Sequence, residues 1–212
     1  MKNQQKLIYP KIILDLEKKY NLLINKRISG NSKELKEYKN LLPSLTNFQK
    51  EALIGLTLGD INLQKLSKNG DYRIRFEYGK INEEYALHLY QLFKHWILSP
   101  PKSMERIMRI KRESNNNRRG KLALPRPAEL GSPIKESILK TLRFQTITHE
   151  SFNFLGELFI KDKNKKSVPS NLIKDHLTEV GLSYWFMDDG GKLDYSKNEG
   201  KGLVFNTQNF SL

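Results

Sequence analysis

Hydrophobic residues recur at helical spacing along much of the chain, and these stretches predict its helices. Residues 1–45 are basic and amphipathic, and a glycine-containing turn at 30–31 divides them. Thr46 then opens a capping box with Gln49, so the apolar run that follows is expected to be a helix. That helix should end near Gly59, where the apolar pattern stops.

More helices are expected downstream. Asn82 should cap the first of them, and its apolar stripe is typical of core packing: Tyr85, Leu89, Leu92, Phe93 and Trp96. The stretch HESFNFLGELFI predicts another, with three side chains directed inward: Phe152, Leu155 and Phe159. A short helix at 171–176 is followed by a longer one, which Thr178 caps and which runs into YWFMDDGG.

Alternating polar and apolar residues predict two strands, at 61–66 and 72–78. Asn69-Gly70 lies between them and is a strong signal for a hairpin turn. One face of the second strand is expected to be core: Tyr72, Ile74, Phe76 and Tyr78. The opposite face would carry polar side chains from both strands: Arg73, Arg75, Glu77, Asn62 and Gln64.

The polar face of these two strands is rich in groups that recognise base edges. Arg hydrogen-bonds guanine, Asn or Gln hydrogen-bonds adenine, and Glu accepts a hydrogen bond from cytosine. The same composition also suits an ordinary solvated sheet face, so this pattern alone leaves both interpretations open.

The remaining strands complete a repeated order of elements. A strand is expected from Met104 and another at 142–147, and KLDY with GLVFNTQ predicts a last hairpin. The first unit is therefore helix, strand, strand, helix, strand, strand, helix, an α+β arrangement, and a second unit begins in the same way. The expected divisions are a basic helical extension at 1–45, a first repeat at 46–165 with a basic insertion near 107–140, and a second repeat at 166–212.

The charge of the chain indicates a class of partner. Thirty-seven Lys and Arg residues outnumber twenty-three Asp and Glu residues, which gives a net charge of +14. Such a surplus favours a polyanion, because neutralised phosphates release counterions on binding; a merely soluble basic protein is the alternative. Lys and Asn are frequent, and both have A- and T-rich codons, which suggests an AT-rich organellar genome such as that of a mitochondrion.

Several classes of function are excluded by what the sequence lacks. The chain has no cysteine, so disulfides, thiolate catalysis and zinc–thiolate sites are ruled out. Its four histidines show no recognisable ligand spacing. No apolar run approaches the ~18–20 residues of a transmembrane helix, and the N-terminal segment lacks the unbroken apolar core of a secretory signal, so no membrane partner is expected.

Two of the predicted helices end in the same way, with an acidic residue. LIGLTLGDI leads to Asp60, and LSYWFMDDGG leads to Asp189. Small residues would let these helices pack closely: Ala52, Gly55, Gly59, Gly181 and Ser183. Two carboxylates brought together repel each other and the helix dipoles, and a divalent cation such as Mg²⁺ removes that repulsion and supports phosphodiester hydrolysis. Either Asp taken alone would be an ordinary residue at a helix end.

These residues carry a resemblance to a known family. LIGLTLGDI and LSYWFMDDG resemble the two signature motifs of the LAGLIDADG homing endonucleases, in their single-chain, two-motif form. LSPP, KKSVPSNL, LSYWFMDDGGKLDY and NTQNF are similar to segments of a yeast mitochondrial, intron-encoded member, from about residue 35 to the C-terminus. The resemblance implies a monomer with a pseudo-twofold αββαββα fold, whose curved antiparallel sheets lie along a long asymmetric site in double-stranded DNA.

The resemblance also implies roles in a DNA cleavage that depends on Mg²⁺ or Mn²⁺. Asp60 and Asp189, the last acidic residue of each motif, would bind the metal at the scissile phosphates. Gly59 and Asp188, one place earlier in each motif, are further metal-binding candidates, with Asp188 secondary. Lys166 matches a basic residue that helps to organise solvent. Further nucleic-acid contacts are expected, from the strand patterns and the basic loop, at Asn62, Gln64, Arg73, Arg75, Glu77, Lys80, Arg118, Arg119, Lys121, Arg143, Gln145, Lys192, Asn206 and Gln208.

The second repeat departs from the family pattern. The family continues through another helix, two more strands and closing helices, whereas one hairpin follows Asp189 here. We therefore expect an incomplete second repeat, either in a fragment or in a shortened protein with another purpose. The alternatives to an endonuclease are a noncatalytic RNA-binding protein, such as an intron maturase or a component of an organellar ribosome, and a DNA-binding protein that no longer cuts.

Overall fold

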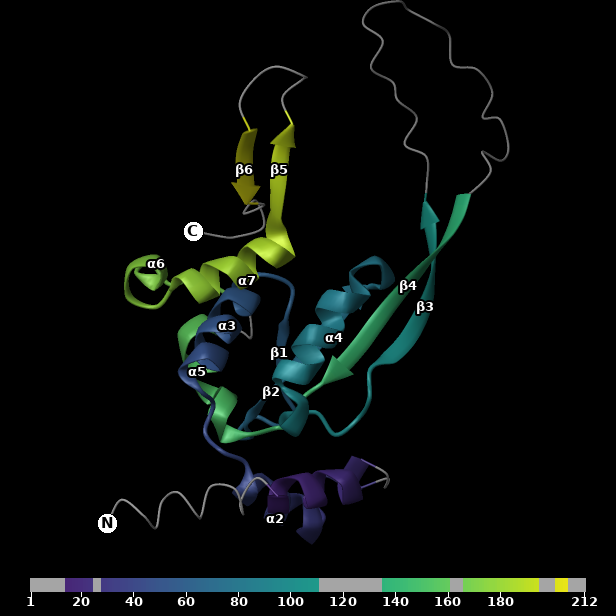
Figure 1. Ribbon diagram of the computed structural model, residues 1–212, viewed down its shortest axis with the longest axis vertical. Coiled ribbons are helices and arrows are strands. Elements are labelled where there is room, and N and C mark those ends of the chain that lie inside the picture. The colour runs from purple at the N-terminus through teal and green to yellow at the C-terminus, as the bar shows by residue number, and fades with distance from the viewer. Residues whose placement is uncertain (1–13, 25–27, 111–134, 161–165, 195–200, 206–212) are drawn as a thin grey trace, which may run out of the picture.

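The computed structural model describes residues 14–24, 28–110, 135–160, 166–194 and 201–205. In these residues a four-stranded antiparallel sheet carries helices on one face, and a separate two-stranded hairpin follows the last helix (Figure 1). The N-terminal helices lie at the opposite end of the molecule from that hairpin. No helix in these ranges is long and apolar enough to cross a membrane. The predicted α+β class is confirmed.

The helices and strands follow one another in the order that the sequence predicts. A helix through residues 14–24 comes first. The later α-helices are α2 (Lys33–Leu41), α3 (Asn47–Leu58), α4 (Glu83–Leu92), α5 (Asn153–Phe159), α6 (Leu172–Asp175) and α7 (Glu179–Asp189). The 3₁₀ helices are η1 (Lys80–Asn82), η2 (Lys94–Trp96) and η3 (Glu150–Phe152). The strands are β1 (Asn62–Lys65), β2 (Tyr72–Gly79), β3 (Lys102–Ile110), β4 (Lys135–Gln145), β5 (Gly190–Asp194) and β6 (Lys201–Phe205).

Helix α3 begins with the predicted capping box. The Thr46 side chain accepts a hydrogen bond from the Gln49 N–H at 3.2 Å, and the Gln49 side chain accepts one from the Thr46 N–H at 3.0 Å. From Ala52 to Leu58 every residue of α3 is buried. A short helix that is apolar on all sides must be packed on all sides, so α3 is the central helix of the fold.

The four-stranded sheet has the order β1-β2-β4-β3, and every neighbouring pair is antiparallel. Residues of β2 alternate in burial as predicted, with Ile74 and Phe76 fully buried and Arg73 and Arg75 on the other face. The register sets Gln64 of β1 opposite Arg73. One sheet face is therefore core, and the other is open and polar.

Strands β3 and β4 are longer than the sequence pattern indicates. They pair from Lys102 opposite Arg143 to Ile110 opposite Lys135, so they occupy both ends of the insertion expected near 107–140. The outer half of this ribbon has little core beneath it, and Ile107 and other apolar side chains there are exposed. Alternation between buried and exposed residues therefore could not predict how far these two strands extend.

The start of α4 differs from the expectation. Asn82 occupies the cap position, but its side chain makes no capping hydrogen bond. The chain enters α4 through the 3₁₀ turn η1, so the backbone at Asn82 is not in the extended conformation that places a capping side chain over the first turn. The apolar stripe of α4 is nonetheless directed inward as predicted, and Leu89 is fully buried.

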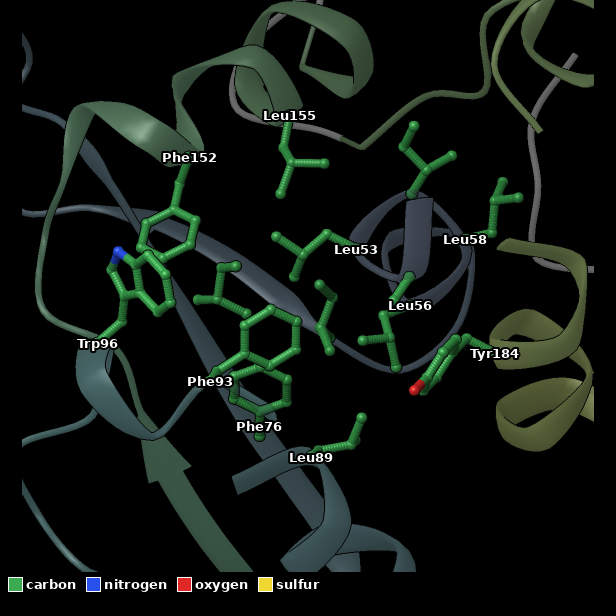
Figure 2. Close-up of a cluster of buried hydrophobic side chains, with 14 of the residues drawn as sticks. Leu53, Leu56, Leu58, Phe76, Leu89, Phe93, Trp96, Phe152, Leu155 and Tyr184 are labelled. Atoms are coloured by element: carbon green, nitrogen blue, oxygen red, sulfur yellow. The ribbon is translucent and has the colours of Figure 1, made fainter. Parts of the chain in front are cut away.

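One apolar core joins the sheet to its helices and also includes α7 (Figure 2). Phe76 of β2 stacks on Phe93 and on Phe144, with ring centroids 5.9 and 4.7 Å apart. Tyr184 of α7 reaches this core and is only 5% exposed. The three residues predicted to face inward from α5 and its 3₁₀ turn are fully buried: Phe152, Leu155 and Phe159. The first unit and the start of the second therefore share a core.

The N-terminal helices form a second apolar cluster beside the main core: Leu16, Tyr20, Leu23, Leu35 and Tyr38. Two tyrosine hydroxyls connect this cluster to the rest of the fold. Tyr38 donates to the backbone carbonyl of His95 at 2.6 Å, and the Tyr20 hydroxyl lies 3.0 Å from that of Tyr90. The extension is thus packed against the end of α4 and η2.

Candidate functional site

Helices α3 and α7 pack against each other at very short range (Figure 1). A Cβ atom added to Gly55 would lie 1.9 Å from the carbonyl oxygen of Gly181, which is far closer than atoms tolerate. The close approach expected from small residues is therefore present at these two glycines. Ser183 takes no part in it: its side chain is exposed and donates to the Glu179 carbonyl at 2.7 Å.

The two helices bring their acidic ends together. The backbone N–H of Asp60, just after α3, donates to the carboxylate of Asp188, near the end of α7, at 3.0 Å. Partial desolvation raises the pKa of Asp60, and the neighbouring charge of Asp189 raises it further, while Lys166 lowers it. Asp60 and Asp189 therefore interact electrostatically, as predicted for a shared site, although they belong to different motifs.

Lys166 lies against the same helix ends. Its ammonium group donates to the carbonyl oxygen of Gly59 at 2.9 Å. Burial lowers its pKa, and the charges of Asp189, Asp60 and Asp188 oppose that shift. Backbone pairing of Ile160 with Lys166 holds this segment beside the end of α5. The structure thus joins the predicted lysine and the predicted carboxylates in one place.

Asp188 is held inward between the two helices. Its carboxylate accepts a hydrogen bond from the Tyr78 hydroxyl at 3.2 Å as well as from the Asp60 N–H. Burial raises the pKa of Asp188 to about 7, and the backbone hydrogen bond from Asp60 opposes this rise. A Cβ atom on Gly59 would lie 2.4 Å from Asp188 Oδ2, so the space beside Gly59 is occupied by this carboxylate.

The donor set at the helix ends fits a hard divalent cation that is bound jointly with a substrate. The available oxygens are the carboxylates of Asp60 and Asp189 and the carbonyl of Gly59, which Lys166 contacts. Within the described ranges, no group of three or more His, Asp or Glu side chains could enclose an ion alone. Mg²⁺ commonly binds through one or two carboxylates together with substrate phosphates and water, which matches such an open site.

The polar face of the sheet gathers most of the described strand residues that were predicted to contact nucleic acid. The Gln64 side chain accepts two hydrogen bonds from Arg73, at 2.9 and 3.2 Å. Arg75 lies between Asn62 of β1 and Gln145 of β4 in the register. These side chains are therefore neighbours on one surface.

Glu77 lies on the same face but already has partners. It forms a bidentate pair with Arg143, whose Nη2 is 2.7 Å from Oε2, and it also contacts Arg75 and Arg106. Sequence reasoning did not select Arg106 or Lys102, which the register places on this face across from β4. Side chains alternate between the two faces of a strand, so Lys102 and Arg106 could have been assigned to this face if the start of β3 had been known.

The other predicted nucleic-acid contacts are placed differently or lie outside the described ranges. Lys80 is in the 3₁₀ turn after β2 and pairs with Glu83. Lys192 is in β5, where only the backbone is described. The rest lie outside the described residues: Arg118, Arg119, Lys121, Asn206 and Gln208.

Comparison with known families identifies this architecture. The model of the LAGLIDADG DNA endonuclease family matches residues 50–212, which include α3, α7 and the acidic residues at their ends. The chain belongs to this family. The matched range includes both helices whose close packing and acidic ends are described above, and their sequences resemble the two motifs of the family.

Individual relatives match most of the chain. A probable intron-encoded endonuclease of Wickerhamomyces canadensis is 35% identical over 193 residues, covering 89% of this chain and 71% of the relative. The solved structure of the homing endonuclease I-WcaI bound to its DNA recognition sequence is similar with a TM-score of 0.68 and 34% identity, covering 91% of this chain and 72% of that one. A cytochrome b mRNA maturase of Debaryomyces hansenii is 30% identical over 165 residues, covering 76% of this chain and half (50%) of the relative.

Proposed function

We propose that this chain is a site-specific homing endonuclease, encoded in an intron, that hydrolyses phosphodiester bonds of double-stranded DNA. The observation that carries the proposal is the meeting of Asp60, Asp189 and Lys166 at the ends of two closely packed helices. Membership of the LAGLIDADG family and the DNA-bound state of the similar I-WcaI structure support it.

The open face of the sheet is the surface that we propose for DNA. It presents arginines and amides side by side, and these are the side chains that read guanine and adenine in the major groove. The net charge of +14 supports binding to phosphates. A twisted antiparallel sheet can follow the groove over several base pairs, which suits a long asymmetric target bound by a monomer.

Each residue at the helix ends has a separate task in the proposed reaction. Asp60 and Asp189 hold the cation, which when bound activates water and stabilises the leaving oxygen. Lys166 places a positive charge beside the carboxylates and stabilises negative charge that develops at the phosphate. Asp188 holds the backbone at Asp60, and thereby keeps the first carboxylate at the end of α3.

The cation that we propose is Mg²⁺, with Mn²⁺ as a substitute, because all the donors are hard oxygens. The proposed location is the mitochondrion. The maturase relatives are named for cytochrome b mRNA, which in yeasts is a mitochondrial transcript. The A- and T-rich codons implied by frequent Lys and Asn agree with an organellar gene.

A second candidate function is binding of intron RNA without cleavage of DNA. The similarity to cytochrome b mRNA maturases favours it, since those relatives belong among the same matches as the endonucleases. Asp60, Asp189 and Lys166 argue for the endonuclease, because RNA binding alone does not require two carboxylates and a lysine that interact electrostatically.

Cleavage of a plasmid library with a randomised insert, in Mg²⁺, tests the proposal. The wild-type chain should enrich one family of cut sites, and Asp60→Asn or Asp189→Asn should slow cleavage by at least about 100-fold. Asp175→Asn makes the same change at an exposed position of α6 and should cut like the wild type. Cutting by the Asp60 variant at the wild-type rate would overturn the mechanism. Tighter binding to structured RNA than to duplex, with no cutting, would establish the second candidate.

A further inference from the structure

One carboxylate on the polar face of the sheet holds three arginines from three strands. Glu77 of β2 binds Arg143 of β4 through both oxygens, with Nη2 2.9 Å from Oε1 and 2.7 Å from Oε2. Arg75, two residues earlier on β2, lies 3.3 Å from Oε2. Arg106 of β3 lies 3.2 Å from Oε1. Strands β2, β3 and β4 are therefore connected on this face by a single side chain.

An acidic residue is unexpected at this position. The other charged side chains that are described on this face are basic: Arg73, Arg75, Lys102, Arg106 and Arg143. A carboxylate on a surface that meets phosphates weakens binding by repulsion. The hydrogen bond from Arg143 is the main cause that holds the pKa of Glu77 below its usual range, so the side chain is ionised at neutral pH.

Glu77 has no capacity left for a base. An ionised carboxylate offers about four acceptor sites. Arg143 uses both oxygens, Arg75 and Arg106 use one each, and the Thr141 hydroxyl donates to Oε1 at 3.4 Å. The cytosine contact that its residue type suggests would require breaking these charge-assisted bonds.

Glu77 also has no large part in core packing. Its side chain is 26% exposed and lies on the face opposite the apolar core, whose side chains from β2 include Ile74 and Phe76. What the carboxylate does is restrict the guanidinium groups around it. An arginine that is already held in one orientation loses less freedom when it binds, and a planar guanidinium held in place can distinguish a guanine edge from other edges.

We propose that Glu77 is a specificity-determining positioning residue, which orients Arg75, Arg106 and Arg143 for base recognition without contacting a base itself. This inference rests on the proposed function, since it needs duplex DNA on this face. It assigns Glu77 an indirect role and adds Arg106 to the recognition surface. It also predicts that removing the acid harms selectivity while it raises affinity for arbitrary DNA.

Glu77→Gln should separate these two effects. The neutral amide accepts fewer hydrogen bonds, so guanidinium groups are released and turn to phosphates. Affinity for random-sequence duplex should rise at low salt, and the slope of log K against log salt should steepen by about one. Preference for the favoured base at the pairs under the cluster should fall by at least about fivefold.

Two further variants separate position from charge. Glu105→Gln removes the same charge from β3, but Glu105 points to the other face, where it pairs with exposed Lys140 at 3.0 Å. It should keep the wild-type base preferences. Glu77→Asp keeps the charge but shortens the side chain, so it should lose preference with a salt slope like that of the wild type.

Selection from a library of random-sequence duplex DNA, with EDTA present to prevent cleavage, measures all four proteins. Thermal unfolding by circular dichroism identifies any variant that is not folded. If Glu77→Gln is not folded, the base preferences of Glu77→Asp test the proposal instead. If the wild type enriches a motif and both Glu77 variants enrich it with unchanged base preferences, Glu77 is not a positioning residue. If the wild type enriches no motif, the proposed DNA function itself fails and this inference fails with it.

Discussion

Gly59 and Asp188 each precede the last acidic residue of a motif. One has no side chain and the other has a carboxylate, because the Asp188 side chain occupies the space beside Gly59. A Cβ atom on Gly59 would lie 2.4 Å from Asp188 Oδ2. The Asp188 carboxylate extends across the pair to the backbone N–H of Asp60. A small residue in the first motif therefore allows the second motif to hold the end of the first helix.

Replacing Asp188 tests this contact. Asp188→Ala leaves the Asp60 N–H and the buried Tyr78 hydroxyl without their acceptor, whereas Asp188→Asn keeps an oxygen for the N–H and an amide that can donate to the tyrosine. We expect the alanine variant to unfold more easily than the asparagine variant, by about 1–3 kcal/mol in urea denaturation. Equal stability of the two variants would show that these hydrogen bonds do not hold the helix end.

Residue type identified the candidate groups, but it could not identify their partners. Asp60 and Asp189 follow from the two motifs and Lys166 from the similarity of KKSVPSNL to a family segment, and the structure places the three together. Glu77 was expected to contact a base because Glu accepts hydrogen bonds. In the structure its carboxylate pairs with Arg106 and Arg143, which are distant in sequence and lie beside it only because the strands pair.

Between elements, α3 and α7 pack backbone against backbone. Each helix contributes a glycine to the contact, and the backbones approach until no side chain fits between them. Such packing has no room to adjust, because the obstacle at Gly55 is the backbone of Gly181 and not a flexible side chain.

Gly55→Ala should therefore destabilise the protein strongly. The added methyl group would force the two helices apart, which we expect to lower the free energy of unfolding by about 2–3 kcal/mol or more, and to slow DNA cleavage because the acidic ends separate too. Gly30→Ala is the matched control, since a Cβ atom there meets nothing within 4 Å. It should change stability by less than about 0.5 kcal/mol. If Gly55→Ala had the same free energy of unfolding as the wild type, α7 would be able to move away from α3 without destabilising the protein.

Elements with one buried face or a clear cap could be predicted, whereas the bounds of elements without either could not. The capping box at Thr46 predicted α3, and Asn69-Gly70 with clean alternation predicted β1 and β2. The strands from Met104 and at 142–147 are predicted, but β3 and β4 continue beyond the core, where Ile107 and Ile138 are exposed, so their full length is not. The 3₁₀ turn before α4 likewise has no signal in residue type.

At the scale of the whole molecule, an N-terminal pair of helices is attached to the main fold by a small apolar cluster and a few polar contacts. Glu17 provides one of these, through the His95 ring at 2.5 Å and Lys94 at 3.5 Å. The hydrogen bond from His95 is the main cause that lowers the pKa of Glu17. The folded state thus favours the ionised carboxylate.

Acid should loosen this attachment before it unfolds the core. Because the pKa of Glu17 is depressed in the folded state, its contribution is complete above the usual Glu range near 4.3 and is lost as pH falls through the lower folded value. Hydrogen-exchange protection of residues 14–24 should fall in this acid range while that of α3 persists. Glu17→Gln should show weak protection already at pH 7. Glu37→Gln, which breaks only a pair with Lys19 within the extension, should not.

The shared core and the hydrogen bond from Asp60 to Asp188 also determine when the protein can become active during its synthesis. Asp60 and the carboxylate that holds it are 128 residues apart in the chain. The ribosome therefore synthesises α3, the four-stranded sheet and α5 before α7. Until α7 is made, the side of α3 that packs against it remains exposed. The nascent chain therefore has the sheet that we propose for DNA binding before it has the second carboxylate. On the proposed function, the DNA-binding surface is therefore synthesised before the residue that completes the cleavage site.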